Sequence, residues 1–208
     1  MKLYSYYNSS SAWRVRIALH YKQLPFEYVA LNLAGEQHSD AHRARSPLAR
    51  IPVLEEEGRY ITESLAILEY LEERHPVPPL LPRDPYLRAR ARMCSEMIVS
   101  EIQPFQNLAT RNRIKELGQD AKAWTVRWLT EGLTALERAV EDTAGTYSVG
   151  ETPTFADCCL IPQLASSRRF GVILETMPTL RRIEATCAAL PAFIAAHADK
   201  QPDTPVLG

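Results

Sequence analysis

The 208-residue sequence lacks any apolar stretch approaching the roughly 20 residues that a transmembrane helix needs. It also lacks the apolar core of a secretory signal peptide near its N-terminus, and it lacks a charge excess, because its formal net charge is -1. We therefore expect a cytoplasmic globular protein whose partners include neither membranes nor nucleic acid. A local run of arginines is expected to form a solvated helix face: Arg83, Arg88, Arg90 and Arg92.

Cysteine is scarce, and its spacing fits neither a metal site nor a redox motif. There is no C-x-x-C pair and no spacing typical of zinc ligands. We expect buried, reduced thiols, as in most cytoplasmic proteins, and no metal site. The four cysteines are Cys94, Cys158, Cys159 and Cys187.

Proline, in contrast, is concentrated in one place and divides the chain. Residues 76–85 carry five of the fifteen prolines and form the clearest linker in the sequence. Residues 1–80 are predicted to alternate strands and helices, and residues 86–208 are predicted to be all helical. A chain of this length is longer than one typical domain, so a two-domain organisation is expected.

The first domain is predicted to contain strands over residues 2–7, 26–31, 51–55 and 60–61. A helix after Ser9 has an apolar side that includes Trp13 and Ile17, and a second helix begins near residue 64, with Ser64 or Thr62 as its cap. Residues 34–46 are polar, with room for a short helix. The order predicts parallel first strands in a four-stranded mixed sheet with helices on both faces.

The helical domain is predicted to begin with one long helix over residues 88–108, bent at Pro104. A second helix follows the apolar spacing of residues 124–140. Thr154 and Asp157 resemble a capping box before a buried helix, and shorter helices follow to about residue 198.

The stretch S-S-S-A-W-R-V-R-I-A-L, residues 9–19, stands out because serines separate a strand from a helix. Serine is a preferred N-cap, since its oxygen accepts from the amides of the first turn. The same place in α/β folds binds anions, because the amides and the helix dipole point there. Local chemistry alone is satisfied by capping.

Other distinctive segments follow in order: S-L-A-I-L-E-Y-L-E-E from residue 64, I-Q-P-F-Q-N-L from residue 102, residues 154–170, and Q-P-D-T-P from residue 201. Together with residues 6–19 and the element order, they resemble the zeta class of glutathione transferases, whose members include maleylacetoacetate isomerase. The resemblance covers essentially the whole chain. It implies a thioredoxin-like α/β N-terminal domain that binds glutathione, an all-α C-terminal domain that forms the substrate site, and a homodimer.

The resemblance implies that three serines form the catalytic centre. Ser9 would contact the glutathione sulfur, where a hydroxyl donor at a helix N-terminus lowers the pKa of the thiol. Ser10 would line the same site. Ser11 stands where the family usually has cysteine, which is not obviously needed because the attacking sulfur belongs to glutathione.

The resemblance also assigns the rest of the glutathione molecule to residues of the first domain. Ile51, before a cis Pro52, would pair through its backbone with the cysteinyl part. Glu63 would hold the ammonium of the γ-glutamyl end, and Ser64, at a helix start, would hold its carboxylate. Gln37 would contact the glycyl end.

The helical domain would contribute further contacts. Gln103 and Asn107 fall one helical turn apart on one face and resemble contacts to glutathione from the same or a neighbouring subunit. Substrate carboxylates would be bound by Arg111 and Arg169, and Arg169 would also be catalytic, because arginine donors stabilise an enolate. Asn8 occupies a position at which related isomerases commonly carry a substrate-binding arginine.

The implied activity is glutathione-dependent cis–trans isomerisation of a maleyl-type diacid to the fumaryl product. Maleylacetoacetate belongs to the catabolism of aromatic amino acids such as tyrosine, and maleylpyruvate to that of gentisate. A zeta-class transferase that dehalogenates small α-halo acids is the alternative, which Asn8 keeps open. A non-catalytic glutathione-binding module is a third possibility, since fold does not fix function, but the set of Ser9, Glu63 and Ser64 argues against it.

Overall fold

The computed structural model describes residues 1–33 and 35–205. It divides into two compact units: Met1–Leu80 together with the C-terminal segment from Ala189, and Leu81–Ala188. The predicted helical domain extended to the C-terminus, whereas the segment from Ala189 belongs with the first unit. The reason is a long-range contact, because the short helix α9 (Pro191–Ala196) packs against the first helix of the chain.

The first unit contains a mixed four-stranded sheet, as predicted. Strands β1 (Lys2–Ser5) and β2 (Glu27–Ala30) are parallel, β3 (Val53–Glu56) is antiparallel to β1, and β4 (Arg59–Thr62) is antiparallel to β3. The spatial order is β2-β1-β3-β4. The peptide bond between Ile51 and Pro52 is cis, which confirms that prediction.

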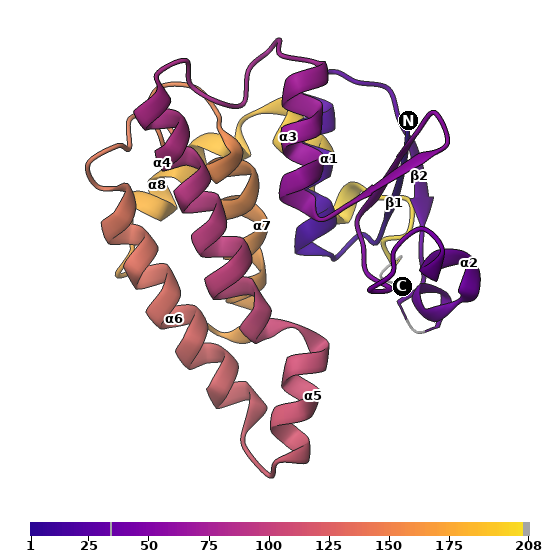
Figure 1. Ribbon diagram of the computed structural model, residues 1–208. Helices are drawn as coiled ribbons and strands as arrows, with labels where there is room; N and C mark the ends of the chain where they lie inside the picture. The colour runs from indigo at the N-terminus through magenta and orange to yellow at the C-terminus, as the bar shows by residue number, and fades with distance from the viewer. Residues whose placement is uncertain (34, 206–208) are drawn as a thin grey trace. The chain divides into compact units, whose positions relative to one another are not determined.

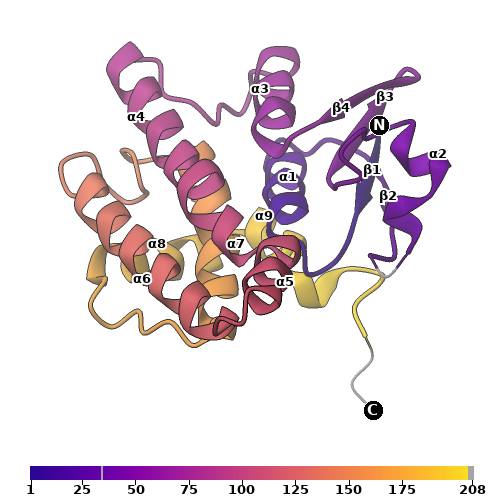
Figure 2. The same ribbon diagram turned by 60° about the horizontal axis from the view of Figure 1, so that its bottom comes forward.

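Helices lie on both faces of the sheet, which is also as predicted (Figures 1 and 2). On one side α1 (Ser10–Tyr21) packs against α3 (Ser64–Arg74). The short helix α2 (Asp40–Arg43), preceded by a 3₁₀ turn over Glu36–His38, lies on the opposite side. This confirms a short helix in the polar stretch after β2.

Helix α1 is buried well beyond the apolar side that the sequence predicts. Every residue from Ala12 to Leu19 is buried, and the side chains of Arg14 and Arg16 have no solvent exposure. Contacts with both α3 and α9 account for this, because they cover faces that the sequence alone would leave to solvent. Two guanidinium groups therefore lie inside the unit and need hydrogen-bond acceptors there.

The cap of α3 also differs from the prediction. The N-cap residue is Glu63, and Ser64 is the first residue of the helix, so neither Ser64 nor Thr62 is the cap. The Glu63 side chain makes no capping hydrogen bond. Its backbone lies at φ 65°, a left-handed conformation that turns the chain sharply from β4 into the helix.

The helical unit begins differently from the single long helix predicted over residues 88–108. Helix α4 (Pro85–Glu96) continues into a π-helical segment (Met97–Ile102) and a 3₁₀ turn (Gln103–Gln106), and α5 (Leu108–Glu116) is a separate helix. Pro104 explains the change, because it has no N–H to donate and its ring clashes with the carbonyl four residues earlier.

The rest of the helical unit follows the predicted pattern more closely. It contains α6 (Ala121–Val140), α7 (Phe155–Phe170) and α8 (Pro178–Ala188), and α6 packs against α7, α8 and α5 (Figure 1). The predicted capping box at the start of α7 is present: the Thr154 N–H donates to the Asp157 carboxylate at 2.7 Å. Burial raises the pKa of Asp157, and its hydrogen bonds oppose that rise.

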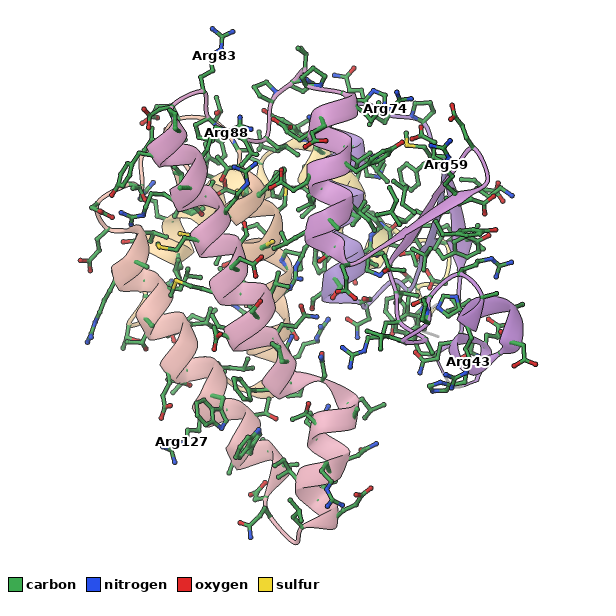
Figure 3. All side chains as sticks on the ribbon, in the orientation of Figure 1. Arg43, Arg59, Arg74, Arg83, Arg88 and Arg127 are labelled. Atoms are coloured by element: carbon green, nitrogen blue, oxygen red, sulfur yellow. The ribbon has the colours of Figure 1, made fainter. Side chains whose placement is uncertain are left out.

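The arginine run is only in part the solvated face that the sequence suggested, because Arg83 is exposed whereas Arg90 is engaged within the fold. Figure 3 shows Arg83 directed away from the loop before α4 and Arg88 on the helix itself. Arg90 is half-buried and donates to the Ala139 carbonyl near the end of α6, and it forms an ion pair with Asp142 at 2.6 Å. Its charge is therefore paired within the fold.

In the described part of the chain, no helix is long and apolar enough to cross a membrane.

A buried ion pair ties the beginning of the linker to the first unit. The Lys22 ammonium, at the C-terminal end of α1, lies 2.7 Å from the Glu72 carboxylate on α3 and also donates to the carbonyls of His75 and Pro78. The same carboxylate accepts from the Leu80 N–H. The lysine side chain has no exposure and the glutamate side chain is 8% exposed. Each charge is thus satisfied by the other and by linker backbone.

We expect Lys22→Met to destabilise the protein by about 3–5 kcal/mol, because the substitution leaves the Glu72 carboxylate buried without its cation. Lys2→Met is the matched control, since its ion pair with Glu27 is 3.9 Å long and both side chains are exposed. The control is expected to cost less than about 1 kcal/mol. Urea unfolding followed by circular dichroism measures both, and equal shifts for the two variants would contradict the role of the buried pair.

Candidate active site

The strand pairing brings several connections to one edge of the sheet. Ser5, the last residue of β1, pairs with Ala30, the last residue of β2. Tyr4 pairs with Val53, the first residue of β3, and Val53 pairs with Thr62, the last residue of β4. The chain therefore leaves β1, β2 and β4, and enters β3, at the same edge.

The predicted glutathione-binding residues of the first unit all lie on the connections at this edge or at the start of the helices that follow them. Residues after β1 lead into α1, residues before β3 carry the cis proline, and residues after β4 lead into α3. These residues are distant in sequence, and the register of the sheet is what brings them together. They are Ser9, Ser10, Gln37, Ile51, Pro52, Glu63 and Ser64.

Ser9 is the N-cap of α1 and is half-buried. Its backbone is extended, at φ -77° and ψ 115°, and its Oγ accepts from the Ala12 N–H at 3.3 Å. Its own N–H donates to the Tyr6 carbonyl at 3.0 Å. A hydroxyl that accepts through a lone pair still has its proton to donate. The capping role is therefore real and is compatible with a hydrogen bond from Ser9 to a thiolate.

The two following serines occupy the first turn of α1. Ser10 is buried and Ser11 is half-buried. Their predicted roles at the glutathione sulfur stay predictions.

Ser64 is held by a buried arginine that the sequence analysis missed. The Arg14 Nη1 donates to the Ser64 Oγ at 3.1 Å, and both residues are buried. This contact brings a positive charge from α1 to the start of α3. The signal was in the sequence, because a charged residue between Trp13 and Val15 interrupts an otherwise apolar run and must have a partner inside the fold.

The start of α3 is suited to a carboxylate. The first turn has no acidic residue and Glu63 supplies no capping side chain, so the helix dipole and the first amides are not used by a local anion. The Glu63 side chain is exposed at the same point, where it can pair with an ammonium. A group that carries both charges, such as an amino acid end, fits this pair of features. The positive φ of Glu63 is a backbone strain of the kind that clusters at binding sites.

The loop before the cis peptide bond is braced by its own side chains. His42 has no solvent exposure, and its Nε2 lies 3.0 Å from the Arg50 carbonyl. The Ser46 Oγ accepts from the Arg50 N–H at 3.0 Å. These contacts fix the backbone immediately before Ile51, whose backbone is predicted to pair with the cysteinyl part of glutathione.

Gln37 is half-buried in the 3₁₀ turn after β2. Its Nε2 donates to the Leu33 carbonyl at 3.0 Å and lies 3.1 Å from the His38 ring. The amide thus stabilises its own turn, and the contact with the glycyl end stays a prediction.

In the helical unit, Gln103 and Asn107 do not share the helical face that was predicted for them. Gln103 opens the 3₁₀ turn, and Asn107 is the extended N-cap of α5, at φ -62° and ψ 144°. The break at Pro104 separates them for the reason given above. Their predicted contacts with glutathione stay predictions.

The helical unit places Arg111 against Phe170, the residue that follows Arg169 in sequence. The Arg111 guanidinium of α5 lies 4.9 Å from the centre of the Phe170 ring, and Phe170 directly follows Arg169 at the end of α7. Arg169 is exposed, and Asn8, in the first unit, is half-buried.

No cluster of three or more histidine, cysteine, aspartate or glutamate side chains suited to a metal ion occurs within residues 1–33 and 35–205.

Comparison with known proteins extends these observations. The sequence model of the glutathione S-transferase N-terminal domain matches residues 3–79. The rat maleylacetoacetate isomerase is 46% identical over 207 residues, which covers 98% of this chain and 94% of the rat protein.

Solved structures of two related enzymes share the fold. The maleylacetoacetate isomerase of Anaeromyxobacter dehalogenans 2CP-1, with dicarboxyethyl glutathione and citrate bound in its active site, is 50% identical with a TM-score of 0.90, covering 99% of this chain and 97% of that one. Another structure of the same enzyme holds glutathione in its active site. The holo maleylpyruvate isomerase, described as a bacterial zeta-class glutathione S-transferase, is 39% identical with a TM-score of 0.94, covering 99% and 100%.

The predicted fold, a thioredoxin-like domain followed by helices, is therefore confirmed. Identities of 39–50% over nearly complete chains are high enough to assign the family. By sequence and by structure, this chain belongs to the zeta-class glutathione transferase family of maleylacetoacetate and maleylpyruvate isomerases.

Proposed function

We propose that this chain is a glutathione-dependent isomerase that converts the cis double bond of a maleyl-type diacid, maleylacetoacetate or maleylpyruvate, to the trans form. One observation carries the proposal: Ser9, with a hydroxyl at the N-terminus of α1, lies at the same sheet edge as the uncapped N-terminus of α3. The first feature suits a thiolate and the second suits the amino acid end of a small peptide.

The first unit supplies the binding residues for glutathione. The amides at the start of α3, with Ser64 held by Arg14, bind the γ-glutamyl carboxylate, and Glu63 pairs with the neighbouring ammonium. The backbone of Ile51 pairs with the cysteinyl part. These contacts fix the peptide so that its sulfur lies at the N-terminus of α1, where Ser9 donates to it.

When bound, glutathione supplies a thiolate that adds to the double bond and is released unchanged after rotation about the resulting single bond. Ser9 favours the ionised sulfur, because a hydrogen bond to a charged acceptor is stronger than one to a neutral acceptor. Arg111 and Arg169 bind the carboxylates of the diacid, and Arg169 stabilises the enolate charge that develops on addition. The related enzyme from Anaeromyxobacter dehalogenans holds dicarboxyethyl glutathione and citrate in its active site, which is the chemistry expected of a diacid site.

We place the protein in the cytoplasm and expect a two-fold homodimer. All four cysteines are buried, and among the described residues none forms a disulfide, which fits a reducing compartment. The homodimer follows from the family, and two-fold symmetry is the commonest arrangement of soluble oligomers.

An ultraviolet assay of both substrates, with and without glutathione, tests the proposed function. We expect isomerisation that requires glutathione and does not consume it. Isomerisation that proceeds equally without glutathione contradicts the proposal. Halide release from an α-halo acid, with no isomerisation of either diacid, would favour the dehalogenating transferase that Asn8 keeps open.

Ser9→Ala is expected to lower activity at neutral pH by roughly ten- to a hundredfold, the value of one hydrogen bond to a charged group. Without this hydrogen bond the thiol of bound glutathione has a higher pKa and ionises later. The rate should therefore recover as the pH rises, and the whole pH profile should shift to higher pH. Steady-state rates measured against pH give both quantities.

Two variants separate this role from neighbouring ones. Ser11→Ala should change the rate and the pH profile much less. Glu63→Gln should raise the KM for glutathione and leave the pH profile in place, because Glu63 acts at the far end of the peptide. Full activity of Ser9→Ala with an unchanged profile would reduce Ser9 to a helix cap and direct attention to Ser10.

Sedimentation at micromolar concentration should show a species of twice the chain mass. We expect this mass because two copies of the chain form an interface, as in the family. A single species of the chain mass across the micromolar range would rule the homodimer out.

A further inference from the structure

The turn that carries Ser9 depends on a buried arginine. Between β1 and α1 the carbonyls of Tyr6 and Tyr7 point away from any strand partner. Arg16 binds both: its Nη1 lies 3.2 Å from the Tyr6 carbonyl and its Nη2 lies 2.9 Å from the Tyr7 carbonyl. Its Nη1 also donates to the Ser5 hydroxyl at 3.1 Å, and its Nε donates to the Ala196 carbonyl of α9.

The C-terminal segment also binds this turn, through the side chain of Asp203. One carboxylate oxygen of Asp203 accepts from the Tyr7 N–H at 2.9 Å, and the other accepts from the Tyr28 hydroxyl at 2.7 Å. Both oxygens of this carboxylate are thus engaged. Tyr7 is held through its N–H by Asp203 and through its carbonyl by Arg16, so its peptide groups have little freedom.

The contacts of the neighbouring residues explain why Asp203 is well positioned. Gln201 donates through its Nε2 to the carbonyls of Ala195 and His197, which fastens the segment to the end of α9. The Thr204 hydroxyl donates to the Ala198 carbonyl. The Q-P-D-T-P segment, which no step of the proposed function uses, therefore acts as an anchor whose central residue reaches the turn before α1.

Arg16 keeps its charge and Tyr28 keeps its proton in this network. Burial lowers the pKa of Arg16 to about 10, while the neighbouring Tyr28 and Asp203 raise it, so the guanidinium stays charged at neutral pH. Burial and the hydrogen bond to Asp203 raise the pKa of Tyr28, which therefore remains a donor. The carboxylate balances a buried cation and orients a buried backbone at the same time.

A displacement of this turn would change the position of Ser9 directly, because the two are joined by a hydrogen bond. The Ser9 N–H donates to the Tyr6 carbonyl, which is the carbonyl that Arg16 also binds. The Ser9 carbonyl and Oγ are held by the first turn of α1, through Trp13 and Ala12. The direction of the Ser9 hydroxyl therefore depends on the turn as well as on the helix.

We propose that Asp203, together with Arg16, is a positioning residue for the thiolate site: it holds the Tyr6–Ser9 turn so that the Ser9 hydroxyl points at the glutathione sulfur. The inference rests on the proposed role of Ser9. It assigns a function to the C-terminal Q-P-D-T-P segment, which acts through backbone and does not touch the reacting atoms.

Asp203→Ala should raise the pKa of the thiol of bound glutathione by about half a unit to one unit and lower kcat/KM at neutral pH by roughly three- to tenfold. Ultraviolet absorbance of the thiolate, titrated against pH, measures the pKa. In the glutathione-free protein, the amides of Tyr7 and Ser9 should exchange hydrogen faster in Asp203→Ala than in the parent protein. Asp203→Asn, which keeps the size but not the second acceptor oxygen, should give smaller changes in the same direction.

Asp199→Asn is the matched control. It removes the same charge four residues earlier, from a side chain that is 77% exposed and pairs with His197. Thiol pKa, amide exchange and kcat/KM should all stay at their parent values. If Asp203→Ala does not fold, Asp203→Asn and Tyr28→Phe, which removes one of the two hydrogen bonds to the carboxylate, carry the test.

The double variant Ser9→Ala/Asp203→Asn separates the two proposals. If Asp203 acts through Ser9, the double variant should have the thiol pKa of Ser9→Ala alone. An unchanged thiol pKa in Ser9→Ala contradicts the role of Ser9, and the amide exchange data still decide whether Asp203 holds the turn. A shifted pKa in Ser9→Ala with parent values of pKa and amide exchange in the Asp203 variants would overturn the positioning role and leave the proposed function intact.

Discussion

The buried guanidinium groups of α1 are the constraint on which the first unit depends. Arg14 and Arg16 have no solvent exposure, and a buried cation without acceptors costs several kcal/mol. Their acceptors include the hydroxyls of Ser5 and Ser64 and the backbone carbonyls of Tyr6, Tyr7 and Ala196. Because these acceptors lie on separate segments, satisfying two charges fixes α1 against α3, α9 and the turn before it.

The same constraint gives the two helix N-termini of the site different properties. The N-terminus of α1 is capped by the Ser9 hydroxyl, which keeps a proton to donate. The N-terminus of α3 has no side-chain cap, and the left-handed Glu63 displaces its own side chain from the first amides. One end is thus suited to donate a single hydrogen bond to sulfur and the other to receive a whole carboxylate. In the function proposed above, this asymmetry sets the direction in which a γ-glutamyl peptide binds.

Local patterns in the sequence predicted much of this structure. Alternating residues and the pair of Thr154 and Asp157 carry their signals within a few residues, and the structure agrees. The cis Pro52 is an expectation from the family resemblance, which the structure confirms. The cap of α3 and the break at Pro104 differ from the predictions for local reasons, and the other failures share one cause, which is contact at long range. The tail joins the first unit because of α9, Arg90 is drawn to Asp142, and α1 is buried on every side. The site residues came from family motifs, whereas the roles of Arg14, Arg16 and Asp203 follow from the partners that the structure gives them.

Position 8 shows how the network bears on the substrate. Asn8 lies between Tyr7, whose N–H and carbonyl are both held, and Ser9, which caps α1, so its backbone has a fixed place. An arginine there could bind a carboxylate with two parallel hydrogen bonds, but the shorter, neutral asparagine cannot. In the function proposed above, the positive charges for a diacid come instead from Arg111, which lies against Phe170, and from Arg169, the residue before Phe170. Specificity among maleyl diacids is therefore expected to depend on the spacing of those two arginines more than on the residues around the sulfur.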